Sequence, residues 1–431
     1  MTVNLLLSRR FAPLFWCQFF SAFNDNFLKT ALVFLILFRI GDASMSHTQG
    51  EVLITLAGAI FIFPYFVLSA LGGELADRYD KARVAQRLKL GEIAIAFVAI
   101  AGFLLASLPV LFAALFGFGV IAALFGPIKY GILPDHLPSS ALPSANALVE
   151  GATFIAILTG TIAAGYFAAV AGAVVIALII ALFALACWLS SLFIPATRES
   201  APDLLIARNI FSSTGTLLRQ LRGDGRLWWG ALVTSWFWLA GIVTLSLLPP
   251  LIKARLGGDE HAVTVYLALF SVAVGCGSAL AAILARGRIV LGITIAGAVV
   301  LGLAAFDLGL ALWGVDAAGG ALSPGELLGT ARGLRVALDL AGIAIGGGLY
   351  IVPVFAAVQA WAGANFRART VAAVNILNAA FMTGATVLVA LLQSLGITIA
   401  MLFAAVGALT LIVAALIRLT LPADTAPQDA R

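Results

Sequence analysis

The stretch FFSAFNDNFLKTALVFLIL, residues 19–37, places polar and charged side chains in the middle of an apolar segment. That segment runs from Phe11 to Phe38, and about 20 apolar residues are enough to span the roughly 30 Å hydrocarbon core of a bilayer. Asp25 is therefore expected near the membrane midplane, where a charge costs at least ~2.5 to 3.5 kcal/mol. Such a residue normally faces a bundle interior or a water-filled path. The stretch predicts a membrane-spanning helix with a polar inner face.

Three polar residues of this stretch, Ser21, Asp25 and Lys29, are spaced four apart. This spacing predicts that all three lie on one helix face, where Asp25 and Lys29 are able to pair. Two interpretations follow, a self-neutralised pair that helps helices pack or a functional polar lining. Because charged side chains are costly to place inside a membrane, the functional polar lining is the favoured interpretation.

The composition of the whole chain predicts an all-α integral membrane protein. Its 431 residues are 62% hydrophobic and 10% charged, with mean hydropathy +1.10. Soluble domains are about 45 to 50% apolar and about 25% charged. The chain's apolar residues form long continuous runs, as in membrane helices, and do not alternate with polar residues as in the strands of a membrane β-barrel.

Twelve apolar runs predict twelve membrane-spanning helices. They lie at residues 11–40, 52–74, 84–106, 109–133, 146–171, 173–195, 227–252, 262–285, 289–314, 334–360, 369–393 and 396–420. The longest polar segment, 196–226, is expected as a cytoplasmic linker between two six-helix halves, 1–195 and 227–421, with a polar tail at 422–431.

The placement of Lys and Arg predicts that both termini are cytoplasmic. Basic residues, Lys89 among them, gather on the side of the N-terminus, as the positive-inside rule expects. The net charge of +5 is explained by this topology and gives no reason to expect nucleic-acid binding. Cys17, Cys187 and Cys276 stand singly in apolar runs and are expected as small packing residues, with no metal site or cofactor.

Between the second and third runs the chain reads GGELADRYDKAR, residues 72–83. A glycine permits close helix approach, an aspartate caps a helix or pairs with a cation, and basic residues hold a loop at the cytoplasmic face. The candidate positions are Gly73, Asp77, Arg78, Lys81 and Arg83. This pattern resembles the loop signature of the major facilitator superfamily, which implies a conformational role. The alternative is a positive-inside loop without a moving part.

Other charges in or near the apolar runs each need a partner or water. Lys129 and Glu150 are placed to form a partly desolvated pair, with structural pairing and gating left open. Glu92, Asp307 and Asp339 are candidate coupling-ion or structural positions, and Asp307 is expected to lie deepest.

Four segments together resemble the bacterial lysophospholipid transporter family, in the form fused to an acyltransferase and acyl-carrier-protein synthetase. They are SAFNDNFLK, GPIKYGILP, ANALVEGATF and RARTVAAVNILNAAFM. The resemblance makes Asp25, Asn26, Lys129 and Glu150 candidate substrate-binding or gating residues. Stand-alone members have a basic residue in the seventh helix, which residues 234–250 lack here, and Lys29 is a candidate substitute.

The resemblance implies a monomeric flippase of the bacterial inner membrane that moves lysophosphatidylethanolamine inward for reacylation, with a cytoplasmic acyltransferase/acyl-ACP synthetase as partner. The alternative within transport is an exporter of drugs or small metabolites. An acyltransferase is not expected, because that chemistry uses a histidine followed four residues later by aspartate. His47, His136 and His261 have no such aspartate.

Overall fold

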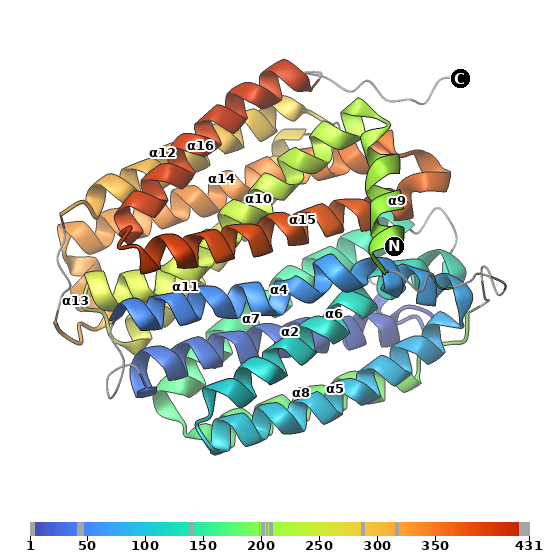
Figure 1. The fold of residues 1–431 in the computed structure, drawn as a ribbon, viewed down its shortest axis with the longest axis horizontal. Helices are drawn as coiled ribbons and strands as arrows, with labels where there is room; N and C mark the ends of the chain where they lie inside the picture. Colours follow the sequence, from blue (N-terminus) through green and yellow to red (C-terminus); the bar gives the residue numbers. More distant parts are fainter. Residues whose placement is uncertain are drawn as a thin grey trace. The chain divides into compact units, whose positions relative to one another are not determined.

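The computed structural model describes residues 5–40, 47–137, 142–197, 199, 203, 206, 210–285, 289–314 and 319–421. Each of the twelve predicted runs coincides with a long helix (Figure 1). These helices are α2 (Ala12–Phe34), α4 (His47–Arg78), α5 (Lys81–Leu104), α6 (Leu108–His136), α7 (Leu142–Val170), α8 (Ala173–Leu192), α10 (Gly225–Pro250), α11 (Glu260–Ala285), α12 (Leu291–Ala311), α14 (Ala331–Trp361), α15 (Gly363–Ser394) and α16 (Ile399–Thr420). The predicted all-α membrane fold is confirmed.

Four shorter elements complete the described part of the chain. Two π-helical turns, η1 (Leu35–Ile40) and η3 (Leu251–Arg255), continue α2 and α10, and the short helices are α9 (Ile210–Arg222) and α13 (Pro324–Gly329). Helix α9 lies inside the segment expected as a linker. Among the described residues, eleven helices are long and apolar enough to cross a membrane, and α5, with Arg87, Lys89 and Glu92 in its first half, is not one of them.

The chain forms two compact units, Met1–Phe34 with Ile60–Leu217, and Leu35–Ala59 with Leu218–Arg431. In the first unit α2 packs on α7 and α8, while α5 packs on α6 and α8. In the second, α14 packs on α11 and α12, and α12 also packs on α16. The boundaries expected for the two halves and the linker stay a prediction.

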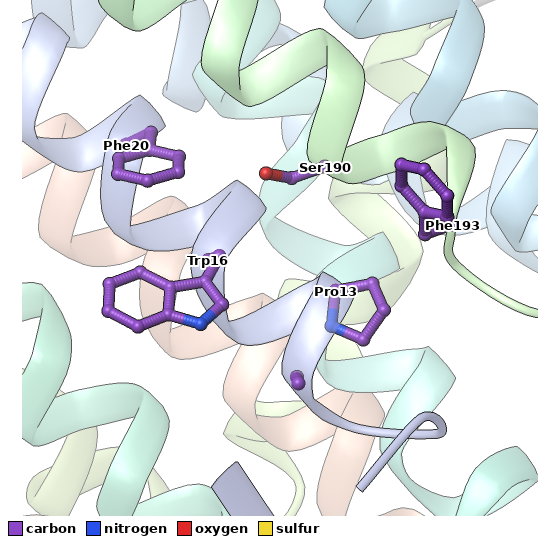
Figure 2. Close-up of a pocket in the computed structure, with 6 residues that line it drawn as sticks. Pro13, Trp16, Phe20, Ser190 and Phe193 are labelled. Atoms are coloured by element: carbon purple, nitrogen blue, oxygen red, sulfur yellow. The ribbon is translucent and has the colours of Figure 1, made fainter. Parts of the chain in front are cut away.

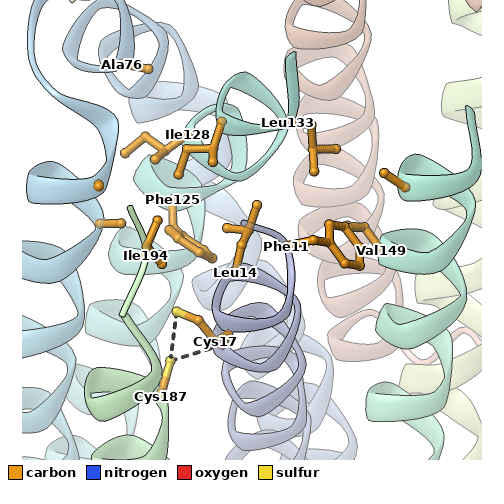
Figure 3. Close-up of a cluster of buried hydrophobic side chains, with 14 residues drawn as sticks. Phe11, Leu14, Cys17, Ala76, Phe125, Ile128, Leu133, Val149, Cys187 and Ile194 are labelled. Carbon is orange, nitrogen blue, oxygen red and sulfur yellow. Dashed lines mark hydrogen bonds between the residues drawn. The ribbon is translucent and has the colours of Figure 1, made fainter. Parts of the chain in front are cut away.

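One hydrophobic cluster of the first unit surrounds the start of α2 (Figure 3). Leu14 and Cys17 of α2 are buried there with Phe125 of α6. The thiols of Cys17 and Cys187 lie 3.8 Å apart, and both cysteines are buried, which confirms their predicted packing role. Cys276 is exposed, so that role was wrong for it.

Glycines bring the backbones of the second unit close together. A Cβ built on Gly346 of α14 would lie 2.8 Å from the carbonyl oxygen of Gly297 in α12. One built on Gly348 would lie 2.6 Å from the carbonyl oxygen of Val274 in α11. The triple glycine at 346–348 therefore lets α14 approach two neighbours at once, as small residues do at membrane helix interfaces.

We expect Gly348→Ala to destabilise the protein by about 1 to 3 kcal/mol, because the added methyl group meets backbone atoms that have no room to yield. Gly384→Ala in α15 is the matched control. A Cβ added at Gly384 would have no atom within 4 Å. Alanine at this position should therefore stabilise the helix by up to about 1 kcal/mol. Thermal unfolding of the two purified variants in detergent checks the difference, and equal unfolding temperatures would contradict the packing argument.

Candidate functional site

The polar centre of α2 is buried inside the first unit. Ser21 is 5% exposed, Asn24 0% and Asp25 8%, and the helix is regular from Ala12 to Phe34. The four-residue spacing therefore gives the shared face that the sequence predicts.

Lys89 of α5 reaches this face, which the sequence interpretation missed. Its Nζ donates to Ser21 Oγ at 2.7 Å and pairs with Glu92 Oε2 at 2.7 Å. The ammonium also lies 4.1 Å from the ring centre of Phe125. Both charged side chains are almost completely buried, at 0% and 1% exposure. Counting Lys89 with the cytoplasmic basic residues was wrong, because it is enclosed between α2, α5 and α6.

The pair expected between Asp25 and Lys29 does not form. Lys29 Nζ instead donates to Asn26 Oδ1 at 3.1 Å, and Asn26 Nδ2 donates to the Ala22 carbonyl oxygen at 2.8 Å. Lys29 also lies 5.9 Å from the ring centre of Phe61. Asn26 therefore orients the lysine, and the Asp25 carboxylate makes no ion pair with any residue that the structure describes.

Asp25 lies within electrostatic reach of four other charges. They belong to Glu92, Lys89, Lys29 and Lys129. We call these five residues the charge cluster. It brings together four of the predicted positions and adds Lys89.

Two buried oxygens, one in the charge cluster and one on the residue that precedes Asp25, have no hydrogen-bond partner in the described part of the chain. They are Glu92 Oε1 and Asn24 Oδ1. Buried acceptors of this kind normally find a donor, so each oxygen is a place for a proton, a water or a ligand donor. Within the charge cluster, the Glu92 carboxylate therefore keeps one oxygen without a hydrogen-bond donor from the described residues.

The predicted pair of Lys129 with Glu150 stays a prediction, because the side chain of Glu150 lies outside the described residues. Lys129 is half-buried, 4.8 Å from the ring centre of Tyr130, and its charge acts on Asp25.

Near the end of α4, just before the loop to α5, the closely packed glycine is Gly72, not Gly73. A Cβ on Gly72 would lie 2.8 Å from the Leu124 carbonyl oxygen, whereas Gly73 has nothing within 4 Å. Close approach was therefore predicted one residue too late. The side chain of Asp77 lies outside the described residues, and the Arg78 guanidinium lies 5.3 Å from the ring centre of Tyr79.

Lys81 and Asp80 make further contacts within the first unit that stabilise this loop. Lys81 Nζ pairs with Asp135 Oδ2 at 2.9 Å, and the lysine side chain is 3% exposed. Asp80 caps α5 by accepting from Ala82 N at 3.0 Å, and it accepts from the hydroxyl of Thr197 at 2.9 Å. Arg83 is exposed and lies 3.7 Å from Asp80. Asp80 was not among the predicted positions, although an aspartate just before a helix is a capping signal.

Asp80 makes the stability of this end of the first unit sensitive to acid. Burial raises the pKa of Asp80, but hydrogen bonds from Thr197 and Ala82 outweigh burial and hold that pKa below its usual value. A lowered folded pKa stabilises the fold above the unfolded value of about 3.9, and this contribution is lost as the pH falls through the folded value.

We therefore expect Asp80→Asn to flatten the pH dependence of unfolding below about pH 5, because the amide keeps an acceptor but does not titrate. Unfolding temperatures of both proteins between pH 3 and pH 7 measure this difference. Asp224→Asn, at the exposed cap of α10, is the control for a cap without the Thr197 contacts. A wild-type slope in Asp80→Asn would assign the acid sensitivity to other carboxylates.

Two predicted acidic positions of the second unit, Asp307 and Asp339, form a separate group with Arg335. Asp307 pairs with Arg335 through contacts of 2.6 and 3.0 Å, and the two side chains are 45% and 50% exposed. Asp307 lies only four residues before the end of α12, so its expected place as the deepest charge was wrong. Asp339 is buried beside this pair, and its Oδ2 has no hydrogen-bond partner in the described region.

Comparison with known proteins gives the family. The sequence model of the Major Facilitator Superfamily matches residues 14–331 of this chain. The lysophospholipid transporter LplT of Yersinia pestis is 32% identical over 286 residues, as is that of Yersinia pseudotuberculosis; the match covers 64% of this chain. The chain spans 65% of the length of these curated relatives.

Solved transporters share the fold. A D-xylose–proton symporter superposes with TM-score 0.70 at 14% identity, covering 97% of this chain and 98% of that one. A POT family transporter bound to a thioalcohol-conjugated peptide gives TM-score 0.73 at 15% identity, covering 95% of both chains. The predicted resemblance to the lysophospholipid transporters is confirmed, while the likeness to the fused form stays a prediction: the chain belongs to the Major Facilitator Superfamily, and within it is similar to the lysophospholipid transporters.

Proposed function

We propose that the protein is a transporter that moves lysophospholipids of the phosphatidylethanolamine type across a membrane. The observation that carries this proposal is the charge cluster, which holds both signs of charge inside one membrane-spanning unit. A charged group within a membrane is a functional-site hypothesis by default. The similarity to proteins named lysophospholipid transporters supports the choice of substrate.

The chemistry of the headgroup fits this cluster. A zwitterionic lysolipid carries a phosphate anion and an ammonium cation a few bonds apart. Asp25, without an ion-pair partner among the described residues, offers a carboxylate to the ammonium. Lys29, held by the neutral amide of Asn26, offers a cation to the phosphate one helical turn away. Lys89 is already engaged by Glu92 and Ser21, so it is assigned to holding the site.

The wider setting of this function is also proposed. The protein would work by alternating access of its halves in the bacterial inner membrane, with both termini cytoplasmic. It would act as a monomer and supply lysolipid to a cytoplasmic acyltransferase/acyl-ACP synthetase. The positive-inside pattern of the sequence supports the orientation, and the family resemblance supports the partner.

Reconstitution into vesicles tests the proposal. Purified protein should move labelled lysophosphatidylethanolamine from the outer to the inner leaflet faster than protein-free vesicles do, measured by protection from an added quencher. Imposed proton or sodium gradients show whether transport is coupled. Absence of lysolipid movement together with export of a small cation would favour the exporter, and acyl transfer by the purified chain would favour an enzyme.

A further inference from the structure

An open groove lies on the outside of the first unit, where α2 begins and α8 ends. It has a volume of about 490 Å³ and is lined by Ala12, Pro13, Trp16, Phe20, Ser190 and Phe193. Figure 2 shows the aromatic rings of Trp16 and Phe20 on α2, with Ser190 and Phe193 on the facing segment. The groove is separate from the charge cluster, with which it shares no residue.

The groove walls are apolar, aromatic and accessible. Trp16 is 46% exposed and Phe193 is 71% exposed. The ring of Trp16 stacks on Phe20 at 5.6 Å between ring centres. The groove thus offers a flat aromatic surface that suits a flexible hydrocarbon chain.

Two exposed arginines, Arg9 and Arg10, precede the groove residue Ala12 by three and two positions in the chain. Arg9 and Arg10 form no ion pair with any residue in the described part of the chain. Backbone hydrogen bonds from Phe11 N and Ala12 N to the Ser8 carbonyl oxygen, 3.0 and 2.8 Å, continue a helical turn back to this point. This turn places the backbone of both arginines directly before the start of α2, where the groove begins.

Neither arginine pairs with an acidic residue in the described ranges, and both lie where a positive charge is unfavourable. Both precede the N-terminus of α2, where the helix dipole already favours anions over cations. A nearby anion would be attracted to the arginines and to the helix end together. An anionic membrane surface attracts basic residues in this way.

We propose that the groove binds one anionic glycerophospholipid of the surrounding bilayer, such as phosphatidylglycerol, as a bound lipid and not as transported cargo. The phosphate lies against Arg9 and Arg10, and one acyl chain lies along Trp16 and Phe193. Figure 2 shows the indole nitrogen of Trp16 on the side of its ring nearer Pro13. That N–H has no hydrogen-bond partner among the described residues and donates to the lipid glycerol ester.

Fluorescence quenching in nanodiscs tests the site with the full chain. Brominated phosphatidylglycerol should quench the Trp16 component, defined by difference from Trp16→Phe, at a concentration at least about fivefold lower than brominated phosphatidylcholine. The double variant Arg9→Gln/Arg10→Gln should remove this preference. Arg418→Gln, an exposed arginine in the last turn of α16, should keep it. Equal quenching by both lipids, or a preference that survives in the double variant, overturns the proposal.

A second variant keeps the test decisive if loss of the arginines disturbs insertion. Phe193→Ala removes an exposed ring from the groove and changes no charge, so it should weaken quenching by phosphatidylglycerol several-fold. Unchanged quenching in this variant would place the lipid elsewhere. Displacement of brominated phosphatidylglycerol by lysophosphatidylethanolamine at equal concentration would make the groove a cargo site and also overturn the proposal. Lysolipid transport in vesicles is measured separately, so a failure here leaves the proposed function standing.

Discussion

Replacement of Lys89 by methionine is expected to destabilise the protein by about 3 to 5 kcal/mol, the usual cost of breaking one half of a buried ion pair. The methionine has nearly the volume of the lysine stem, so packing is preserved. The Glu92 carboxylate, however, would stay buried without a cation, keeping only the 3.5 Å contact from the Ser21 hydroxyl to Oε2, and Ser21 Oγ would lose its donor. Thermal unfolding of the purified variant in detergent measures the loss.

Two companion variants separate charge from packing. Arg87→Met removes a charge from an exposed side chain of the same helix and should change stability by no more than about 0.5 kcal/mol. Lys89→Met/Glu92→Leu removes both charges and should recover most of the loss, because well-packed apolar residues often replace a buried pair without cost. If Lys89→Met alone unfolds at the wild-type temperature, the pair contributes nothing to stability. A stable double variant that fails to transport would give the pair a role in transport.

The fold was predictable because one local signal determines it. An apolar run long enough for the bilayer core marks each membrane-spanning helix, so all twelve runs coincide with helices. The grouping of residues 35–59 with the second unit is not readable in this way, because it depends on contacts distant in sequence. The short helix α9 was missed because its segment is polar.

The candidate site was predictable only where its residues share one helix. The four-residue spacing gave the buried face of α2, but partner choice depends on which helices meet. Lys89 was counted as a surface charge because arginines surround it in sequence. The signal that would have found it is its spacing of three from Glu92, which allows a pair on one helix face. The opposite error was made for Asp307 in the second unit. It was expected deep in the membrane because its sequence neighbours are apolar, yet it lies close to the end of α12.

Asp25→Asn is expected to lower lysolipid transport at least about a hundredfold, because an amide lacks the charge that would bind the headgroup ammonium. Folding should be nearly unchanged, since asparagine matches the size of aspartate and Asp25 forms no ion pair with a described residue. Initial rates in vesicles, normalised to reconstituted protein, measure the first effect, and thermal unfolding measures the second.

Asp307→Asn is the matched control, because it removes the same charge from a membrane helix outside the charge cluster. Its pair with Arg335 is half-exposed, and such pairs contribute only about 0 to 1 kcal/mol, so transport and stability should stay close to wild type. Asp25→Glu restores the charge one methylene further from the backbone and should recover part of the activity. Full transport by a well-expressed Asp25→Asn variant would make Asp25 a structural polar group. Loss of transport in both asparagine variants would show that any neutralised carboxylate is harmful, which leaves the special role of α2 unsupported.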